Sequence, residues 1–324
     1  MKKIILLSIV SFAVSFCGPS VNVTELRSRA KSTFGVIPEK MPGAEKDTPD
    51  LVALGKMLYL DKRLSINDTQ SCSSCHSLDG KQGGVDNRRF STGAKGSLGG
   101  RNAPTVLNAG FHFAQFWDGR AQTLSDQAKG PILNPVEMAM PSDKAVIEKL
   151  SKLPEYKEAF GKAYPSVKNP ITYQNLADAI AAFERTLITH DRFDDFLKGD
   201  DKALNKNELV GLQTFMNQGC NACHLGPLLG GNSYRKMGAL KPFETKDMGR
   251  YEVTKKEEDK MVFKVPSLRN VALTAPYFHD GSAATLEDAV AKMAVHQLGK
   301  QIGEQDLRAI VSFLKSLTDK SREK

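Results

Sequence analysis

Two short motifs of the chain carry residues whose types and spacing could do chemistry. Residues 72–76 read CSSCH and residues 220–224 read CNACH, so each is Cys-x-x-Cys-His. In this order the two thiols can form thioethers with the vinyl groups of a haem, and the next residue, histidine, can ligate its iron. The motifs therefore predict two covalently bound c-type haems, with these attachment residues and proximal iron ligands: Cys72, Cys75, His76, Cys220, Cys223 and His224.

Other uses of these cysteines fit the sequence less well. A thioredoxin-like dithiol lies in a βαβ pattern, which the sequence does not show. A zinc site favours cysteine pairs closer in the sequence, although folding can unite distant pairs. Chance could produce one such pentapeptide, but the two motifs use four of the five cysteines of the chain. We therefore expect haem attachment at both motifs.

The amino-terminal residues have the pattern of an export signal. Lys2 and Lys3 precede an apolar run over residues 4–16, which is too short to span a bilayer. We assign residues 1–17 to a signal peptide or lipoprotein signal and expect a periplasmic protein with no transmembrane span after it. Cys17 ends the run, either as the site of a lipid anchor or as part of a removed signal.

The composition is that of a folded protein with a basic surface. The 324 residues are 40% hydrophobic and 25% charged, with a formal net charge of +8. This apolar content is enough for a core. We interpret the positive excess as solvated surface charge. No run of Lys and Arg is interleaved with aromatic residues, so we expect no nucleic-acid partner.

Periodicity indicates a mainly α fold. Apolar residues at helical spacing predict helices over residues 175–189, 206–218, 285–299 and 304–317. Strand signals are scarce. We therefore expect two cytochrome c-like haem domains packed together, with few strands.

The two motifs suggest how the chain divides. We place an N-terminal haem domain at residues 24–187 and a C-terminal haem domain at residues 188–309. The tail, residues 310–324, is assigned as an addition to the first domain. We interpret residues 18–48 as a polar, loosely ordered lead-in, and outside the haem motif the halves show no evident sequence repeat.

Five longer stretches carry a more specific signal. They are RNAPTVLNAGFHFAQFWDGR (101–120), QAKGPILNPVEM (127–138), FERTLIT (183–189), VPSLRNVALTAPYFHDGS (265–282) and TLEDAVAKM (285–293). In content, order and spacing they resemble the bacterial dihaem cytochrome c peroxidases, also called the MauG-like family. With the haem motifs, the resemblance covers residues 48–317. It implies that the N-terminal haem is peroxidatic and that the C-terminal haem receives electrons.

The same resemblance implies roles for single residues. Glu137 matches the family's catalytic glutamate, and a carboxylate suits general acid–base work on peroxide. Gln127 matches the amide that positions the oxygen ligand, and Trp117 matches the tryptophan between the haems. Met293 matches the distal ligand of the input haem, where His plus Met raises the reduction potential. His279 matches a histidine beside the haems that is not an iron ligand.

The family also implies a calcium ion and redox partners. Asn102, Thr274 and Pro276 match the positions of its calcium ligands, and backbone carbonyls suit such a hard cation. The substrate would be hydrogen peroxide, and the electron donor a small cytochrome c or cupredoxin. Family members are often dimers, so a homodimer is part of the expectation.

One position departs from the family pattern. Residues 79–102 form a long glycine-rich loop, and loops of this length are often functional. Many family members carry a histidine there that caps the peroxidatic iron in the resting enzyme. Here Ala94 stands at that place. Lys95 or His112 is left as a substitute ligand, although lysine must first lose its proton.

Two other functions remain open beside peroxide reduction. MauG-type oxidation of a protein substrate is one, but that branch replaces the distal methionine with tyrosine, so Met293 argues against it. The second is a dihaem electron carrier without catalysis, against which Glu137 and Gln127 argue.

Overall fold

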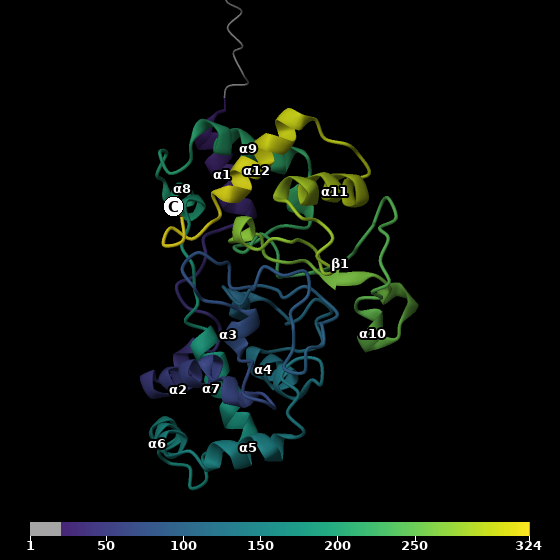
Figure 1. Ribbon diagram of the computed structural model, residues 1–324. Coiled ribbons are helices and arrows are strands. Elements are labelled where there is room, and N and C mark those ends of the chain that lie inside the picture. Colours follow the sequence, from purple (N-terminus) through teal and green to yellow (C-terminus); the bar gives the residue numbers. More distant parts are fainter. Residues whose placement is uncertain (1–20, 324) are drawn as a thin grey trace, which may run out of the picture.

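The computed structural model describes residues 21–323 as a mostly helical molecule (Figure 1). The expected signal, residues 1–17, and its Cys17 lie outside the described residues. Within them, no helix has the length and apolar character needed to cross a membrane. The only sheet of the described chain pairs two short antiparallel strands, β1 (Tyr234–Lys236) and β2 (Val262–Lys264). The expected mainly α fold class is confirmed.

All four helices expected from apolar spacing are present. They are α7 (Tyr173–Glu184), α9 (Lys206–Asn217), α11 (Leu286–Leu298) and α12 (Glu304–Lys315). Thr285 caps α11 by accepting a hydrogen bond from the Asp288 backbone N–H at 3.1 Å. The other helices are α1 (Val23–Thr33), α2 (Pro49–Leu60), α3 (Cys72–Cys75), α4 (Leu124–Leu133), α5 (Asp143–Ser151), α6 (Pro154–Ala163), α8 (Arg192–Lys198) and α10 (Tyr251–Thr254).

The first core forms where α2 crosses α7, in the lower half of Figure 1. The helices approach closely because Gly55 has no side chain. A Cβ at Gly55 would lie only 1.8 Å from the carbonyl oxygen of Ala179. Leu54 and Leu58 of α2 bury their side chains in this core. The first CxxCH motif follows α2 in the sequence and is held against it.

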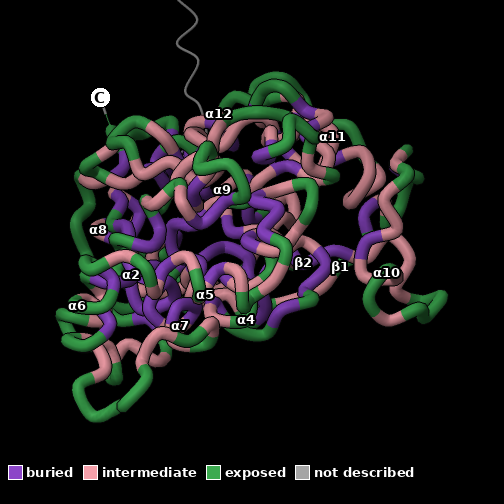
Figure 2. The backbone as a smooth tube through the Cα atoms, turned by 60° about the horizontal axis from the view of Figure 1, so that its bottom comes forward, coloured by how far each residue is buried: buried purple, intermediate pink, exposed green. Residues whose placement is uncertain are grey.

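The second core repeats this arrangement in the upper half of Figure 1. There α9 crosses α12, and a Cβ at Gly211 would lie 1.9 Å from the carbonyl oxygen of Ala309. Phe215 and Phe313 meet at 5.5 Å between ring centroids. The second CxxCH motif follows α9, as the first follows α2. Figure 2 shows the buried residues running through the middle of the molecule.

The start of the described chain differs from the sequence interpretation. Residues 23–33 form α1 rather than a loosely ordered lead-in, and Asn22 caps it by accepting from the Glu25 N–H at 3.2 Å. Leu26 and Ala30 face one side of the helix, and they pack with Phe34 in the second core. The apolar residues Leu26, Ala30 and Phe34 recur every four residues, and this spacing predicts the helix.

The tail has contacts in both halves. Near its end, Arg322 donates to the carbonyl oxygens of Asp79 and Gln82 in the first half. Ile310, Phe313 and Leu314 of α12, followed by Leu317, belong to the second core. The apolar contacts of α1 and α12 therefore lie in the C-terminal half. We propose that both segments go with the C-terminal haem domain, so that the divisions expected at residues 24 and 310 shift accordingly.

The two halves share a repeated loop that the sequence interpretation missed. The same spacing separates Asn108 from Asn270 and Phe116 from Phe278, and all four adopt left-handed backbone, with φ of 61°, 62°, 67° and 73°. Each loop closes on an antiparallel bridge and leads into a threonine-capped helix, α4 or α11. The repeat places Trp117 and His279 at equivalent positions. The signal in the sequence is a set of identical residues at the same spacing, such as Pro104 and Pro266, Asp118 and Asp280, and Thr123 and Thr285.

Candidate active site

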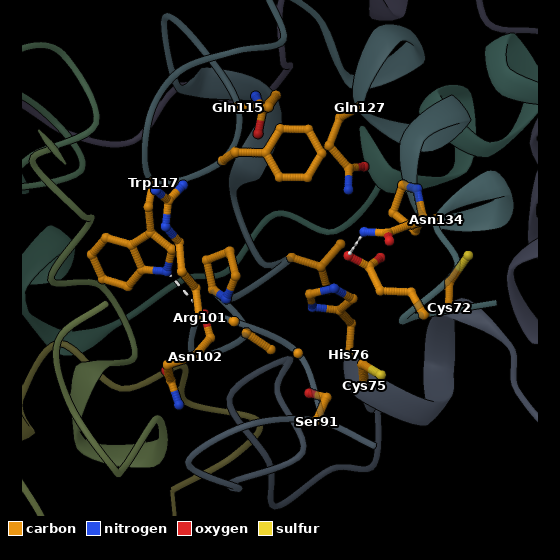
Figure 3. A pocket seen from close by; sticks show the side chains of 18 of the residues that line it. Cys72, Cys75, His76, Ser91, Arg101, Asn102, Gln115, Trp117, Gln127 and Asn134 are labelled. Atoms are coloured by element: carbon orange, nitrogen blue, oxygen red, sulfur yellow. Dashed lines mark hydrogen bonds between the residues drawn. The ribbon is translucent and has the colours of Figure 1, made fainter. Parts of the chain in front are cut away.

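Each CxxCH motif opens into its own cavity. The first cavity, of about 750 Å³, is lined by Cys72, Cys75 and His76 (Figure 3). The second, of about 370 Å³, is lined by Cys220, Cys223 and His224. Both volumes fall in the range of roughly 300–1,000 Å³ that is usual for cofactor sites. None of these four cysteines is joined in a disulfide.

The first motif is positioned by a short helix. The thiols of α3 stand at its two ends, and Ser71 and Ser74 close a capping box at its start. Tyr59 of α2 donates a hydrogen bond to the carbonyl oxygen of His76 at 2.5 Å, which fixes the backbone of that residue. Burial lowers the pKa of His76 and so favours its neutral form, the form that ligates a metal.

The second motif fixes the tautomer of its histidine. The Nδ1–H of His224 donates to the carbonyl oxygen of Leu229 at 2.9 Å, which leaves Nε2 as the free nitrogen. Met293 of α11 lines the same cavity, so a thioether and an imidazole share one site. The thiols, the imidazole and the volume of each cavity together fit covalent haem at both motifs.

The first cavity also gathers the predicted catalytic groups. Gln127 of α4 and Glu137, which follows that helix, line it together with His76. Asn134 donates from Nδ2 to Oε1 of Glu137 at 2.8 Å, the dashed contact beside it in Figure 3. Burial raises the pKa of Glu137, although the positive charge of Arg120 opposes this shift. A carboxyl and an amide therefore face the haem-binding space.

A common wall separates the two cavities. Residues 102–105 together with Phe116 and Trp117 line both of them. Trp117 donates from Nε1 to the carbonyl oxygen of Asn102 at 2.9 Å. His279 lies against it, with ring centroids 6.4 Å apart, and lines the second cavity. The structure thus brings Trp117 and His279 together between the cavities, at equivalent places of the repeated loops.

The wall is held by a reciprocal pair of backbone hydrogen bonds. The N–H of Asn102 donates to the carbonyl oxygen of His279 at 2.7 Å. The N–H of Lys264 donates to the carbonyl oxygen of Trp117, also at 2.7 Å. These two bonds are related by the repeat, and they join the halves directly at the wall.

The substitutes considered for the missing loop histidine lie elsewhere. Ala94 is buried beside the first cavity, whereas Lys95 is exposed and does not line it. His112 lines the second cavity and accepts at Nδ1 from Nζ of Lys264 at 2.7 Å. Neither residue faces the space above His76.

The three predicted calcium positions lie around the second cavity and the wall. Asn102, Thr274 and Pro276 all line that cavity, and Asn102 is buried. No cluster of three or more acidic, histidine or cysteine side chains suited to a metal occurs in residues 21–323. A cation there would depend on amide and carbonyl oxygens, which suit calcium.

Two cavity residues were not found by sequence reasoning. Glu184, at the end of α7, is buried, lines the first cavity, and has its pKa raised to about 8 by that burial. Lys264 is 5% exposed and lines the second cavity. Glu184 lies inside the quoted FERTLIT stretch, but a single charged residue in a helix carries no local signal of burial.

Comparison with known proteins places this arrangement in a family. A family model described as di-haem cytochrome c peroxidase matches residues 49–202. The cytochrome c551 peroxidase of Nitrosomonas europaea is 45% identical, covering 98% of this chain and 92% of that protein. The enzyme of the same name from Pseudomonas aeruginosa is also 45% identical, covering 99% and 94%.

More distant relatives share the architecture. The methylamine utilization protein MauG of Methylorubrum extorquens is 30% identical over 95% of this chain and 94% of its own length. A crystal structure of a MauG-like protein associated with microbial copper homeostasis has a TM-score of 0.77 at 27% identity, with 88% and 94% of the chains covered. The chain belongs to the di-haem cytochrome c peroxidase family and is an enzyme of that family, a peroxidase that carries two c-type haems.

Proposed function

We propose that the protein reduces hydrogen peroxide to water with electrons from a small periplasmic cytochrome c or cupredoxin. Electrons would enter at the C-terminal haem and pass to the N-terminal one. The observation that carries this proposal is the first cavity, where Glu137 and Gln127 face the same space as Cys72 and His76.

The overall reaction combines hydrogen peroxide, two electrons and two protons into two waters. When bound, the N-terminal haem supplies an iron at which the O–O bond is broken, and the C-terminal haem supplies electrons. Glu137 accepts the proton of one peroxide oxygen and returns it to the other, which becomes water. Gln127 orients the peroxide through its amide. Asn134 holds the Glu137 carboxyl in place through their hydrogen bond.

The second cavity suits electron entry. Met293 and His224 would both hold the iron of this haem, and a His–Met pair of ligands raises the reduction potential. Trp117 and His279 fill the space between the cavities with aromatic rings. In this proposal the N-terminal half reduces peroxide and the C-terminal half receives electrons.

The test uses the holoprotein with both haems attached. A reduced small cytochrome c should be oxidised on addition of peroxide, and Glu137→Gln should lower this rate by roughly 10²-fold or more, the usual scale for a lost acid–base group. Glu158→Gln is the matched control, because Glu158 lies exposed on α6. Equal rates for the two variants would remove Glu137 from the mechanism.

The alternatives have weaker support. A MauG-type oxidase of a protein substrate would have tyrosine where Met293 lines the second cavity. A carrier without catalysis would not need a buried carboxyl beside the first haem. Peroxide turnover separates the carrier from both enzymes, and modification of a protein substrate separates the oxidase.

The remaining expectations belong to this proposal as well. We propose a periplasmic location, with Cys17 either lipidated or removed, and a calcium ion held by Asn102, Thr274 and Pro276. The buried amide of Asn102 at the wall supports that cation. We also propose a homodimer, because members of the family are often dimers. A measurement of the molecular mass in solution tests this.

A further inference from the structure

A buried lysine and a histidine form a pair in the second cavity. Lys264 ends β2 and is 5% exposed. Its Nζ lies 2.7 Å from Nδ1 of His112, which follows the short helical turn Ala109–Phe111. Both side chains line the cavity that holds Cys220 and Cys223. Neither has a part in the peroxide chemistry proposed above.

The surroundings of Lys264 contain no anion. Among the described residues that line the second cavity there is no aspartate or glutamate. Arg269 also lines it, but its guanidinium is paired with Asp191 and Asp194. Within residues 21–323 no carboxylate lies within ion-pair distance of Lys264. Burial lowers the pKa of Lys264 to about 8. A buried ammonium without a counter-charge is unfavourable.

The other ring nitrogen of the histidine packs beside Gly231, where a Cβ would lie 3.1 Å from Nε2. An ammonium can only donate, so Nδ1 of His112 accepts from Lys264 and the ring proton is on Nε2. This Nε2 is buried and has no hydrogen-bond partner in the described structure. An orphaned buried N–H is unfavourable. The pair therefore offers the ammonium of Lys264, positioned by His112, to an acceptor that carries negative charge.

The position of Lys264 is held by the wall. Its backbone N–H donates to the carbonyl oxygen of Trp117 at 2.7 Å. In the repeat, Lys264 stands where Asn102 stands in the other half, bonded in the same way to His279. The charged side chain therefore starts from a rigid point between the two haem cavities.

We propose that Lys264, held by His112, binds a propionate carboxylate of the C-terminal haem. A haem carries two propionates on the edge away from its vinyl groups, so a haem joined to Cys220 and Cys223 brings the missing anion into this cavity. Lys264 neutralises that carboxylate, and Nδ1 of His112 holds the ammonium in place by accepting from it. The proposal rests on the second haem of the proposed function, but not on peroxide turnover.

The charge pairing has a measurable consequence. A positive charge near a haem favours the state that has gained an electron, so Lys264 raises the reduction potential of the C-terminal haem. Lys300 is a matched control. It is exposed, and its positive charge also acts on Cys220 of the same motif. Lys264→Gln and Lys300→Gln remove the same charge from the same haem, but only the first removes the proposed contact.

The experiment uses holoprotein in which mass spectrometry confirms two haems. Resonance Raman spectra report the propionate bending band, and spectroelectrochemistry reports the potential of the C-terminal haem. We expect Lys264→Gln to shift the band and to lower the potential several times more than Lys300→Gln does. His112→Asn should shift the band without changing the charge. Lys264→Arg should keep the potential nearer that of the parent protein.

These measurements test the propionate contact independently of peroxidase activity. Identical bands and potentials in Lys264→Gln and Lys300→Gln would overturn it, even if peroxide turnover is normal. If Lys264→Gln fails to attach the second haem, Lys264→Arg and His112→Asn decide. An unchanged propionate band in both of these variants would then overturn the assignment, and a shifted band in both would support it.

Discussion

The backbone N–H of Ala94 donates to the carbonyl oxygen of Glu137 at 2.7 Å. This bond ties the glycine-rich loop to the segment that carries the proposed acid–base group. The loop turns tightly at that point, because Gly93 donates to Ser97 at 2.8 Å and Thr92 bridges to Leu98. Gly93 has no room for a side chain, since a Cβ would lie 2.1 Å from the carbonyl oxygen of Val136. The loop thus packs beside the cavity without offering an iron ligand.

The first prediction follows from Ala94. With Lys95 exposed and His112 in the other cavity, the oxidised holoprotein should bind and consume peroxide without prior reduction of the C-terminal haem. An absorption spectrum of the fully oxidised protein should show a high-spin signal that shifts promptly on adding peroxide. Ala94→His is the matched variant, and it should slow that reaction by supplying a tethered imidazole. A wholly low-spin spectrum that reacts only after half-reduction would contradict this prediction.

The second prediction concerns the pH dependence of turnover. Glu137 must be ionised to accept a proton, so activity should fall as pH drops through its pKa. Arg120 lowers that pKa by its positive charge, against the larger effect of burial. Arg120→Gln should therefore raise the pKa and move the acid limb of the rate profile to higher pH. The profile of kcat/KM measures this shift, and an acid limb unmoved by the substitution would mean that another group titrates.

The third prediction concerns the ligand of the input haem. Met293→His should keep the C-terminal iron six-coordinate but lower its reduction potential, because imidazole replaces the soft thioether. Turnover should fall as electron entry slows. Redox titration measures this potential. Met237→Leu is the control, because Met237, the residue after β1, is a second methionine that lines the same cavity. An input haem with unchanged potential in Met293→His would show that some other residue is the ligand.

The fourth prediction tests the close crossing of α2 and α7. Gly55→Ala should destabilise the protein by roughly 1–3 kcal/mol, because its Cβ meets backbone rather than a movable side chain. Gly161→Ala, on the open side of α6 with nothing within 4 Å, should stabilise it by about 1 kcal/mol through helix propensity. Urea unfolding of the two variants measures both effects. Similar stabilities would show that the helices separate freely at Gly55.

The sequence alone predicts those features that a short continuous segment determines. One haem would bind Cys72, Cys75 and His76 together, so these residues must lie close in the sequence. The five-residue motif therefore predicts haem attachment. Amphipathic spacing likewise predicted α7, α9, α11 and α12. Glu137 and Met293 needed the family resemblance, because a single glutamate or methionine has no pattern of its own.

The wall between the cavities could not be predicted in this way. Trp117 and His279 are far apart in the sequence, and their contact depends on reciprocal backbone bonds from Asn102 and Lys264. The repeat that produces those bonds combines left-handed backbone with matching residues, such as Pro104 with Pro266 and Asp118 with Asp280. The matching residues do not by themselves show which backbone groups bond to each other. Burial of Glu184 and Lys264 is likewise a result of packing between distant segments.

The last prediction uses the buried carboxyl of Glu184. Burial raises its pKa from 4.5 to about 8, and its Oε2 has no hydrogen-bond partner in the described structure. Between these two values the folded state keeps a proton that the unfolded state releases. The free energy of unfolding should therefore fall as pH rises, by up to about 1.4 kcal/mol for each pH unit. Glu184→Gln cannot ionise, so its stability relative to the parent should grow across that window and level off above it. Urea unfolding of the holoprotein at several pH values measures the difference, and exposed Glu158→Gln should show none of this growth. Parallel stability curves for Glu184→Gln and the parent would mean that Glu184 is already ionised in the folded protein.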